Sequence, residues 1–409
     1  MKLGLENIRA LLDHLGSPDS RYRILHVAGT NGKGSTASYL AAGLRATGLS
    51  TGLFTSPHLV DFRERVRVDG EPIGETDVAE IWNEIRPEVG RRNMTFFEAN
   101  TAIALLHFAR RGCEVAVLET GMGGRLDATT ATVPAVCVLT RIAFDHRDYL
   151  GKSLRAIAGE KAAILRAGAP GFSATQDPAA AGAIRTRGER AGSTVAFVGD
   201  PSRVRVESGR TEFTWRGLRV RLAMVGEHQA QNALLALETL SWLLPAVAPA
   251  ALAQALSTVE VPGRFQRVAR PVGPLLLDVA HNPDALACFA RTFEDAYRGL
   301  PKRVFVAMLR DKDLPGSLAA LRRLEGLIPP LLVGCAASAP ENRRFRVEDW
   351  LALPAPVREG AAWVGGVPAG IAELDRWQAA APGGVAALVG SFTSVGEEMA
   401  VLRVDTLAG

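Results

Sequence analysis

Cysteine is scarce in this sequence, and long apolar runs are absent. The four cysteines, Cys113, Cys137, Cys288 and Cys335, lie far apart in apolar segments and form no CxxC pair. This usage is typical of reduced core residues in a cytoplasmic protein. No window reaches the roughly 18 uninterrupted apolar residues of a membrane span. The N-terminal segment MKLGLENIRALLDHLG also lacks the apolar stretch of a signal peptide.

Charge of one sign is not concentrated anywhere along the chain. The net charge is +4, and no run of five or more basic residues occurs. A charge this small over 409 residues does not support nucleic-acid binding, but it is compatible with small anionic substrates. The length suffices for two domains with full cores. We therefore expect a cytoplasmic protein, most simply a monomer, that binds neither membranes nor nucleic acid.

A glycine-rich turn follows the first apolar segment and predicts a phosphate-binding loop. The run from Ile24 to Ala28 is typical of a short buried strand, and a helix is expected beyond the turn, ending near Gly48. This layout lets backbone N–H groups and the helix N-terminus bind phosphate oxygens. Lys33 would neutralise the outer phosphates, and Ser35 or Thr36 would hold Mg²⁺. The predicted nucleotide-binding residues of the turn are Gly29, Thr30, Asn31, Gly32, Lys33, Gly34, Ser35 and Thr36.

The spacing of this turn differs from the usual P-loop, in which the hydroxyl residue directly follows the lysine. Here Gly34 separates Lys33 from Ser35, and Gly29 precedes Gly32 by three residues. An ordinary strand-to-helix turn, whose glycines serve only the backbone, is the alternative interpretation. The lysine and hydroxyls stand where a triphosphate needs them, which favours the nucleotide site.

Polar residues at the ends of two further predicted strands indicate another part of the site. An apolar run over 113–118 predicts a buried parallel strand, and Glu119 closes it ahead of a glycine-rich loop. Because α/β sheets place catalytic groups at the carboxyl ends of their strands, Glu119 can reach a Mg²⁺ that bridges nucleotide phosphates. The next strand, over 135–140, leads to Asp145 and His146. Taken alone, His146 is interpreted as a hydrogen-bonded loop histidine.

A helix expected over 153–167 carries a lysine on its apolar face. Lys161 follows Ile157 by one helical turn, so both side chains are directed inward. Burial would lower the pKa of this lysine. A neutral amine can react with CO₂ to give a carbamate, which is an anionic ligand. The alternative is a lysine whose aliphatic stem follows the apolar surface until the ammonium reaches water, and the residues alone favour neither.

The rest of the chain predicts β-rich turns over 169–225, then a helix that opens at Gly226, and a domain break marked by the Pro-Gly turn within 261–265. Strands and helices then alternate, which predicts a second, smaller doubly wound α/β domain. The expected strands are 274–280, 303–308, 331–334 and 385–390. Polar clusters end three of these strands and belong on one ligand-binding edge. The clusters are Asp278–Pro283, Asp311–Asp313 and Gly390–Phe392.

Several of these phrases together resemble one family. GTNGKGST is similar to the ATP site of the Mur ligase superfamily. HVAGTNGKGST, TSPHL, ETGMGGRLD, EKA, GEHQAQNA, DVAHNP and DKD resemble its folate branch, folylpolyglutamate synthase and dihydrofolate synthase. The resemblance implies an α/β protein of two domains: a P-loop ATPase-like domain over 1–262 with a mostly parallel sheet, and a smaller Rossmann-like glutamate-ligase domain over 263–409. The peptidoglycan Mur ligases carry a nucleotide-sugar domain before their P-loop, for which we expect no room here.

The resemblance also implies roles for single residues around the nucleotide. Nucleotide contacts are implied for Asn232, Arg264 and Asp278. A metal site is implied for Ser35, Ser56, Glu119 and His146. Lys161 matches a lysine that is carbamylated and supports a second Mg²⁺. The expected cofactors are therefore ATP, two Mg²⁺ ions and carbamylated Lys161.

For the substrates, the resemblance implies a pterin-binding loop and a glutamate pocket. The residues expected to contact substrate are Pro57, His58, Phe97, Arg125, Asp127, His281, Asp311 and Ser391. Among them, His281 and Ser391 match the pocket for the incoming glutamate. Taken alone, His58 is interpreted as a solvated loop histidine and Phe97 as a core residue.

The implied activity is that of an ATP-dependent ligase that joins L-glutamate to dihydropteroate, to tetrahydrofolate (poly)glutamate, or to both. ATP would convert the acceptor carboxylate into an acyl phosphate, which the glutamate amine would then attack. The expected catalytic residues are Lys33, Glu119, His146, Lys161 and His281. Another Mur-type ligase with a different acceptor is one alternative, against which the TSPHL stretch argues. A non-enzymatic nucleotide switch is the other, and it would have no use for the domain-edge clusters.

Overall fold

The first sheet is built around the strand that leads into the glycine-rich turn. The computed structural model describes residues 4–407. In it β1 (Arg23–Ala28) lies between the parallel strands β5 (Val115–Glu119) and β6 (Val136–Leu139). The strand order is β4-β3-β2-β5-β1-β6-β7-β8, with antiparallel pairings only where β3 meets β2 and β4. The other strands are β2 (Thr51–Phe54), β3 (Val66–Val68), β4 (Glu71–Pro72), β7 (Gly171–Ser173) and β8 (Val195–Phe197).

Both faces of this sheet are covered by helices, because its central strands are apolar on both sides. Leu25 and Val27 of β1 belong to a core shared with α2 (Lys33–Arg45), α8 (Glu227–Leu243) and α9 (Pro249–Leu256). Ile24 and Ala28 belong to the cores on the opposite face. The helices there are α1 (Glu6–His14), α3 (Glu75–Arg92), α4 (Phe96–Arg110), α6 (Leu154–Lys161) and α7 (Pro178–Ala191).

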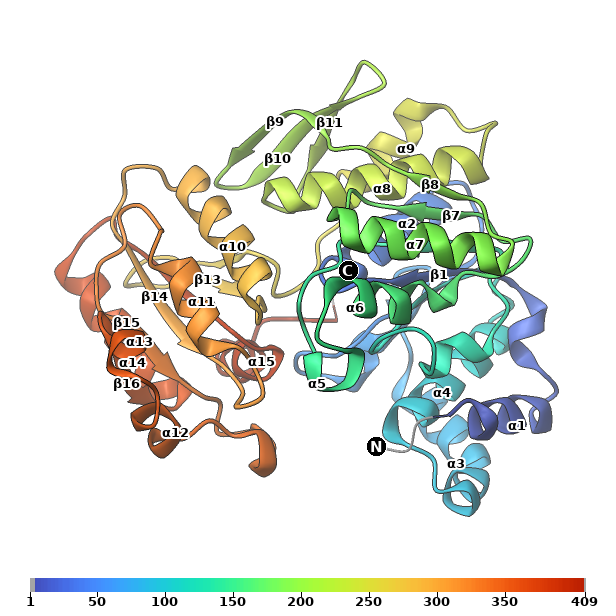
Figure 1. The fold of residues 1–409 in the computed structure, drawn as a ribbon, viewed down its shortest axis with the longest axis horizontal. Coiled ribbons are helices and arrows are strands. Elements are labelled where there is room, and N and C mark those ends of the chain that lie inside the picture. Colours follow the sequence, from blue (N-terminus) through green and yellow to red (C-terminus); the bar gives the residue numbers. More distant parts are fainter. Residues whose placement is uncertain (1–3, 408–409) are drawn as a thin grey trace.

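A small antiparallel sheet packs against α8 at the top of Figure 1. Its strands are β9 (Ser202–Glu207), β10 (Arg210–Trp215) and β11 (Leu218–Leu222), in the order β11-β10-β9. Phe213 and Trp215 of β10 join the same core as the α2 and α8 helices. The short helix α5 (Arg147–Leu150) follows the loop after β6.

Two local predictions are wrong. The segment 169–225, predicted as β-rich turns, contains the helix α7 between its strands. This helix begins where the Asp177 carboxylate accepts a hydrogen bond from the Ala179 N–H, and Gly192 ends it with φ of 67°. The helix predicted over 153–167 ends at Lys161 and continues only as a 3₁₀ turn over Ala162–Ile164, whose side chains are buried against the sheet.

The second domain is a six-stranded sheet in the order β12-β13-β17-β14-β15-β16, parallel except for β12. Its strands are β12 (Gln266–Val268), β13 (Leu275–Asp278), β14 (Lys302–Ala307), β15 (Leu331–Gly334), β16 (Ala361–Gly365) and β17 (Val385–Val389). Its helices are α10 (Pro283–Ala296), α11 (Leu314–Leu321), α12 (Val347–Leu351), α13 (Ala355–Arg358), α14 (Val367–Ala380) and α15 (Phe392–Val401). The two-domain α/β fold is thus confirmed. We propose a boundary at 262/263, inside the linker between α9 and β12.

The carboxyl ends of both sheets face the space between the domains, since residues that follow β1, β5, β6, β13, β14 and β17 line a single cavity. Parallel α/β sheets bind ligands at this end of their strands. Within residues 4–407, none of the helices combines the length and the apolar character needed to cross a membrane.

Candidate active site

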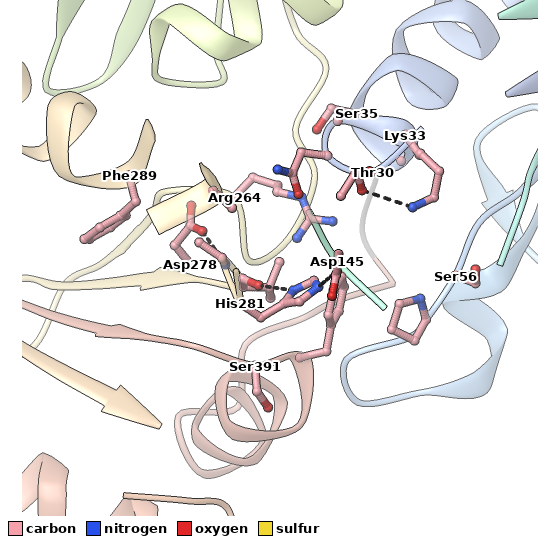
Figure 2. Close-up of a pocket in the computed structure, with 18 of the residues that line it drawn as sticks. Thr30, Lys33, Ser35, Ser56, Asp145, Arg264, Asp278, His281, Phe289 and Ser391 are labelled. Carbon is pink, nitrogen blue, oxygen red and sulfur yellow. Dashed lines mark hydrogen bonds and ion pairs between the residues drawn. The ribbon is translucent and has the colours of Figure 1, made fainter. Parts of the chain in front are cut away.

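The glycine-rich turn after β1 forms a compact cradle at the start of α2. Gly32 has φ of 86°, a left-handed conformation that favours glycine. A Cβ atom at this position would lie 2.2 Å from Oδ1 of Asn232, so the α8 asparagine packs directly on the turn. Lys33 Nζ donates a hydrogen bond to the Thr30 carbonyl at 3.3 Å (Figure 2). Together with the N-terminus of α2, these groups form a site for a polyphosphate.

Glu119 is a buried carboxylate at the mouth of this cradle. It accepts a hydrogen bond from the Ser56 N–H at 3.0 Å, and Lys33 Nζ lies 3.8 Å away. Burial raises its pKa, and the Lys33 charge acts in the opposite direction. Ser35, also buried, lines the same cavity. A buried carboxylate and a hydroxyl beside a phosphate site are the ligands that Mg²⁺ prefers, so these residues fit the expected ion.

Among the described residues, no three His, Cys, Asp or Glu side chains gather closely enough to hold a metal by themselves. An ion at Glu119 would therefore draw its other ligands from hydroxyls, water and phosphate oxygens, as Mg²⁺ commonly does at nucleotide sites.

Lys161 lies inside the protein behind the cradle. Its side chain is 4% exposed, and Nζ donates a hydrogen bond to the Gly29 carbonyl at 2.7 Å. Burial lowers its pKa to about 7, with a further contribution from the Lys33 charge. The lysine thus points inward from α6 and does not reach bulk water along the surface. At neutral pH a large fraction of its amine is uncharged, which is the form that reacts with CO₂.

A cluster of charges joins the two domains in front of the cradle. Asp145 accepts a hydrogen bond from Lys312 Nζ at 2.7 Å, and His281 Nε2 lies 3.3 Å from its other oxygen (Figure 2). Burial acts to raise the pKa of Asp145, but the His281 hydrogen bond and the charges of His281 and Lys312 hold it well below its usual range. His281 is oriented through Nδ1, 2.9 Å from the Val279 carbonyl. His146 Nε2 lies 3.8 Å from Asp145, and burial lowers its pKa to about 4, so it is neutral at physiological pH.

The nucleotide side of the cavity is also shared between the domains. The half-buried Arg264 guanidinium lies over the Phe392 ring at 5.0 Å, and it faces Gly34 of the cradle. Asp278 accepts hydrogen bonds from the N–H groups of Phe265 and Ala280, both at 2.8 Å. These contacts tie the end of the domain linker, directly before β12, to the loop that follows β13.

A direct contact crosses the gap at Asn31. Its side-chain amide donates to Asp284 at 2.9 Å and accepts from the Asn282 amide at 3.0 Å. Asp284 is also paired with Arg141. The cradle is therefore held against the start of α10, and the cavity it faces has a volume of about 1070 Å³.

The loop 56–65 after β2, called the acceptor loop below, forms the opposite wall. Ser56, Pro57, His58 and Arg65 line the cavity. Arg65 Nε donates to His58 Nδ1 at 2.8 Å, and the Arg65 guanidinium lies 5.6 Å from the centre of the Phe96 ring. His58 is therefore a hydrogen-bonded wall residue and is not freely solvated.

The structure brings most of the predicted residues to this cavity. Those that line it are Thr30, Asn31, Gly32, Lys33, Gly34, Ser35, Ser56, Pro57, His58, Glu119, His146, Lys161, Asn232, Arg264, Asp278, His281 and Ser391. Gly29 and Thr36 lie just behind its surface, where the Thr36 hydroxyl is buried without a hydrogen-bond partner. Four predicted substrate residues lie outside the cavity lining, namely Phe97, Arg125, Asp127 and Asp311.

These four side chains have other partners. Phe97 packs on Phe54, with ring centres 5.9 Å apart. Asp127 is buried and accepts a hydrogen bond from the Met122 N–H at 2.9 Å, so its carboxylate stabilises the glycine-rich loop that follows Glu119. Arg125 and Asp311 form surface ion pairs, the first with Glu160 and the second with Arg343.

Sequence reasoning did not include Asp145, Lys312, Arg65 or Asp284 among the site residues. Asp145 directly precedes a predicted ligand at a strand exit, and Lys312 stands inside the Asp-Lys-Asp cluster. Both signals were present in the sequence. The 2.7 Å contact between Asp145 and Lys312 could not be predicted from the sequence, because 167 positions separate the two residues.

Comparison with known proteins agrees with this geometry. The Mur ligase middle domain family matches residues 27–240. The dihydrofolate synthase/folylpolyglutamate synthase of Bacillus subtilis is 32% identical over 343 residues, which cover 79% of this chain and 80% of the relative. A probable bifunctional folylpolyglutamate synthase/dihydropteroate synthase of Haloferax volcanii is 38% identical over 348 residues; the match covers 80% of this chain but only 41% of that longer relative.

Solved structures resemble the whole chain. Mycobacterium tuberculosis folylpolyglutamate synthase, complexed with ADP and AMPPCP, is 32% identical with a TM-score of 0.89, covering 98% of this chain and 96% of that one. An Escherichia coli structure in complex with DHPP and ADP is 30% identical with a TM-score of 0.84, covering 98% and 94%. A bifunctional folylpolyglutamate synthase/dihydrofolate synthase structure with Mn, AMPPNP and L-glutamate bound is 30% identical with a TM-score of 0.83, covering 99% and 95%. The chain belongs to the folylpolyglutamate synthase/dihydrofolate synthase family of the Mur ligases.

Proposed function

We propose that this protein is an ATP-dependent ligase that attaches L-glutamate to dihydropteroate, to reduced folate (poly)glutamates, or to both. The observation that carries the proposal is the single cavity in which the phosphate cradle, Glu119, the acceptor loop and His281 meet. A Mur-type ligase with another acceptor is the alternative. A relative that aligns with this chain over most of its length is named for folate substrates, and this favours the folate acceptor.

The nucleotide would bind across the domain gap. In this proposal the cradle and Lys33 hold the phosphates, and Asn232, Arg264 and Asp278 make further contacts with the nucleotide. Mg²⁺ held by Ser35 and Glu119 would neutralise charge on the transferred phosphoryl group. Arg264, which comes from outside the first sheet and is half-buried, would stabilise the same charge, as arginines do in other phosphoryl transfers.

Lys161 is proposed to carry a carbamate. Its neutral amine would attack CO₂, forming an N–C bond and releasing one proton to solvent. The product replaces a buried cation by an anion, which would then help to hold a second Mg²⁺ together with His146. Two observations support this: a side chain that is 4% exposed, and a pKa that burial lowers to about 7.

The amide would form in two steps. The acceptor carboxylate attacks the γ-phosphorus of ATP, so that an acyl phosphate forms and ADP leaves. The glutamate amine, positioned by the second domain, then attacks the acyl carbon, and phosphate leaves with the former carboxylate oxygen. We assign His281 and Ser391 to glutamate binding, because both lie at the strand ends of the second domain and line the cavity.

An ADP-release assay tests the proposal. Purified protein is supplied with ATP, Mg²⁺ and L-glutamate, first with dihydropteroate and then with tetrahydrofolate monoglutamate. We expect ADP release that requires both the acceptor and glutamate, and one new amide per ADP by mass spectrometry. If neither acceptor stimulates ADP release and no amide is formed, the proposal is wrong.

A further inference from the structure

The carboxylate of Glu64 organises the acceptor loop. One of its oxygens accepts a hydrogen bond from the Leu59 N–H at 2.7 Å, and the other accepts from the N–H groups of Val60 and Asp61, both at 2.8 Å. Three consecutive backbone donors therefore converge on one side chain. This arrangement sets the path of the loop between Pro57 and Arg65, whose side chains line the cavity.

The same carboxylate is bound by a residue of the second domain. The hydroxyl of Thr406, a residue only 4% exposed, donates to the oxygen that serves Val60 and Asp61, at 2.7 Å. Thr406 belongs to residues 402–407, called the strap below, which follow α15. The acceptor loop and the strap are thus 342 positions apart in sequence but share one carboxylate.

Arg67 anchors the strap a second time. Its guanidinium donates to the Leu407 carbonyl at 2.9 Å and to the Thr406 carbonyl at 3.1 Å, and it also binds the Gly70 carbonyl. Arg67 lies on β3, directly beyond the acceptor loop. The strap therefore lies against the first domain through both a side-chain and a backbone contact.

The helix that carries the strap also touches the loop. At Gly396 of α15, an added Cβ would lie 2.1 Å from the Leu59 carbonyl oxygen, so helix and loop are in backbone contact. The same helix begins at Phe392, next to Ser391, at the glutamate side of the cavity. Figure 2 shows Ser391 at the start of this helix, on the opposite side of the cavity from Ser56.

We propose that Glu64, Thr406 and Gly396 are positioning residues that fix the acceptor loop to the glutamate-binding domain. The acceptor loop then adopts its substrate-binding conformation only when the second domain is docked against the first. Binding of acceptor and docking of the glutamate domain are coupled in this way. The phosphate cradle has its own contacts with the second domain, through Asn31, and these involve none of the three residues, so ATP binding does not depend on them. The inference rests on the proposed ligase function for its kinetic consequences but not for the contacts themselves.

Kinetics of point variants test the coupling. Thr406→Val removes the hydroxyl, and Glu64→Gln leaves one acceptor oxygen where two are used. We expect each to raise KM for the acceptor at least fivefold, with KM for ATP within twofold of the parent. Thr406→Ser, which keeps the hydroxyl, should restore the parent KM. The effects of the two changes should be less than additive in the double variant, because both weaken the same cluster of contacts around one carboxylate.

Thr76→Val and Glu80→Gln serve as matched controls, since both residues are exposed on α3. Neither should change any KM. A parallel rise of KM for ATP and acceptor in Thr406→Val would contradict the coupling and indicate general loss of structure.

Hydrogen exchange provides a readout that does not need activity. The amides of Leu59, Val60 and Asp61 should exchange at least tenfold faster in Glu64→Gln and measurably faster in Thr406→Val than in the controls. If the parent protein shows no ligase activity but these amides respond, the proposed function fails while the contact stands. Unchanged exchange and unchanged acceptor KM in an active enzyme would overturn the inference.

Discussion

His26 offers a quantitative test of how the first domain is held together. It lies on β1, fully buried, and its Nε2 is 2.8 Å from the Thr129 hydroxyl, which in turn bonds to Asp127. Asp127 holds the Met122 N–H of the loop after Glu119. Burial, with a smaller contribution from the Arg166 charge, lowers the pKa of His26 from 6.5 to about 3. We predict that His26→Gln removes a pH-dependent part of the stability.

The sign and size of this part follow from proton linkage. Between pH 6.5 and pH 3 the unfolded chain binds a proton at His26 and the folded chain does not, so stability is lost as the pH falls. At pH 5 the protonated imidazole exceeds the neutral one about 30-fold in the unfolded chain. This lowers the free energy of unfolding by about 2 kcal/mol, whereas at pH 7 the decrease is close to zero.

Urea unfolding at pH 7 and pH 5 measures this difference. Parent and His26→Gln share their other titrating groups, so the difference between their pH responses isolates the histidine. We expect the parent to lose about 2 kcal/mol more than the variant between the two pH values. Parallel responses would refute the assignment of a buried neutral imidazole.

Three further predictions concern the nucleotide and metal residues. Gly32→Ala should weaken binding of a non-hydrolysable ATP analogue about tenfold or more in calorimetry, because a left-handed alanine costs about 1–2 kcal/mol and its Cβ displaces Asn232. Arg264→Met should lower kcat at least about 100-fold in the ADP-release assay, the effect of removing one preorganised donor to the transition state, and an unchanged kcat would contradict its role. Parent activity should fall in CO₂-depleted buffer and return with bicarbonate, whereas Lys161→Met should stay inactive in both; insensitivity of the parent to CO₂ would exclude the carbamate.

The parts of the site that local sequence determines could be predicted. The cradle, Glu119 and the inward-pointing Lys161 each follow from a strand end or a helical period, which short segments fix by themselves. The helix α7 was missed because its alanines and glycines give a weak apolar stripe, and its start and end depend on Asp177 and Gly192.

Contacts between distant segments could not be predicted from the sequence. The ion pair of Asp145 with Lys312 and the contact of Thr406 with Glu64 depend on how the two domains dock. Asp127 shows the opposite limitation: the resemblance of its phrase to the family implied a substrate contact, but the carboxylate accepts hydrogen bonds from the N–H groups of Met122 and Thr129 and does not line the cavity. Such hydrogen bonds decide where a side chain at a loop end points, and they cannot be predicted from the spacing of residues in the sequence.

The central claim is that ATP activates the acceptor carboxylate on the larger domain before glutamate from the smaller domain captures it. Transfer of ¹⁸O tests this most directly: the acceptor is labelled at both oxygens of its reacting carboxylate, and the released phosphate is analysed by mass spectrometry. The account predicts one ¹⁸O atom in each phosphate for every amide formed. Amide formation with unlabelled phosphate would contradict it.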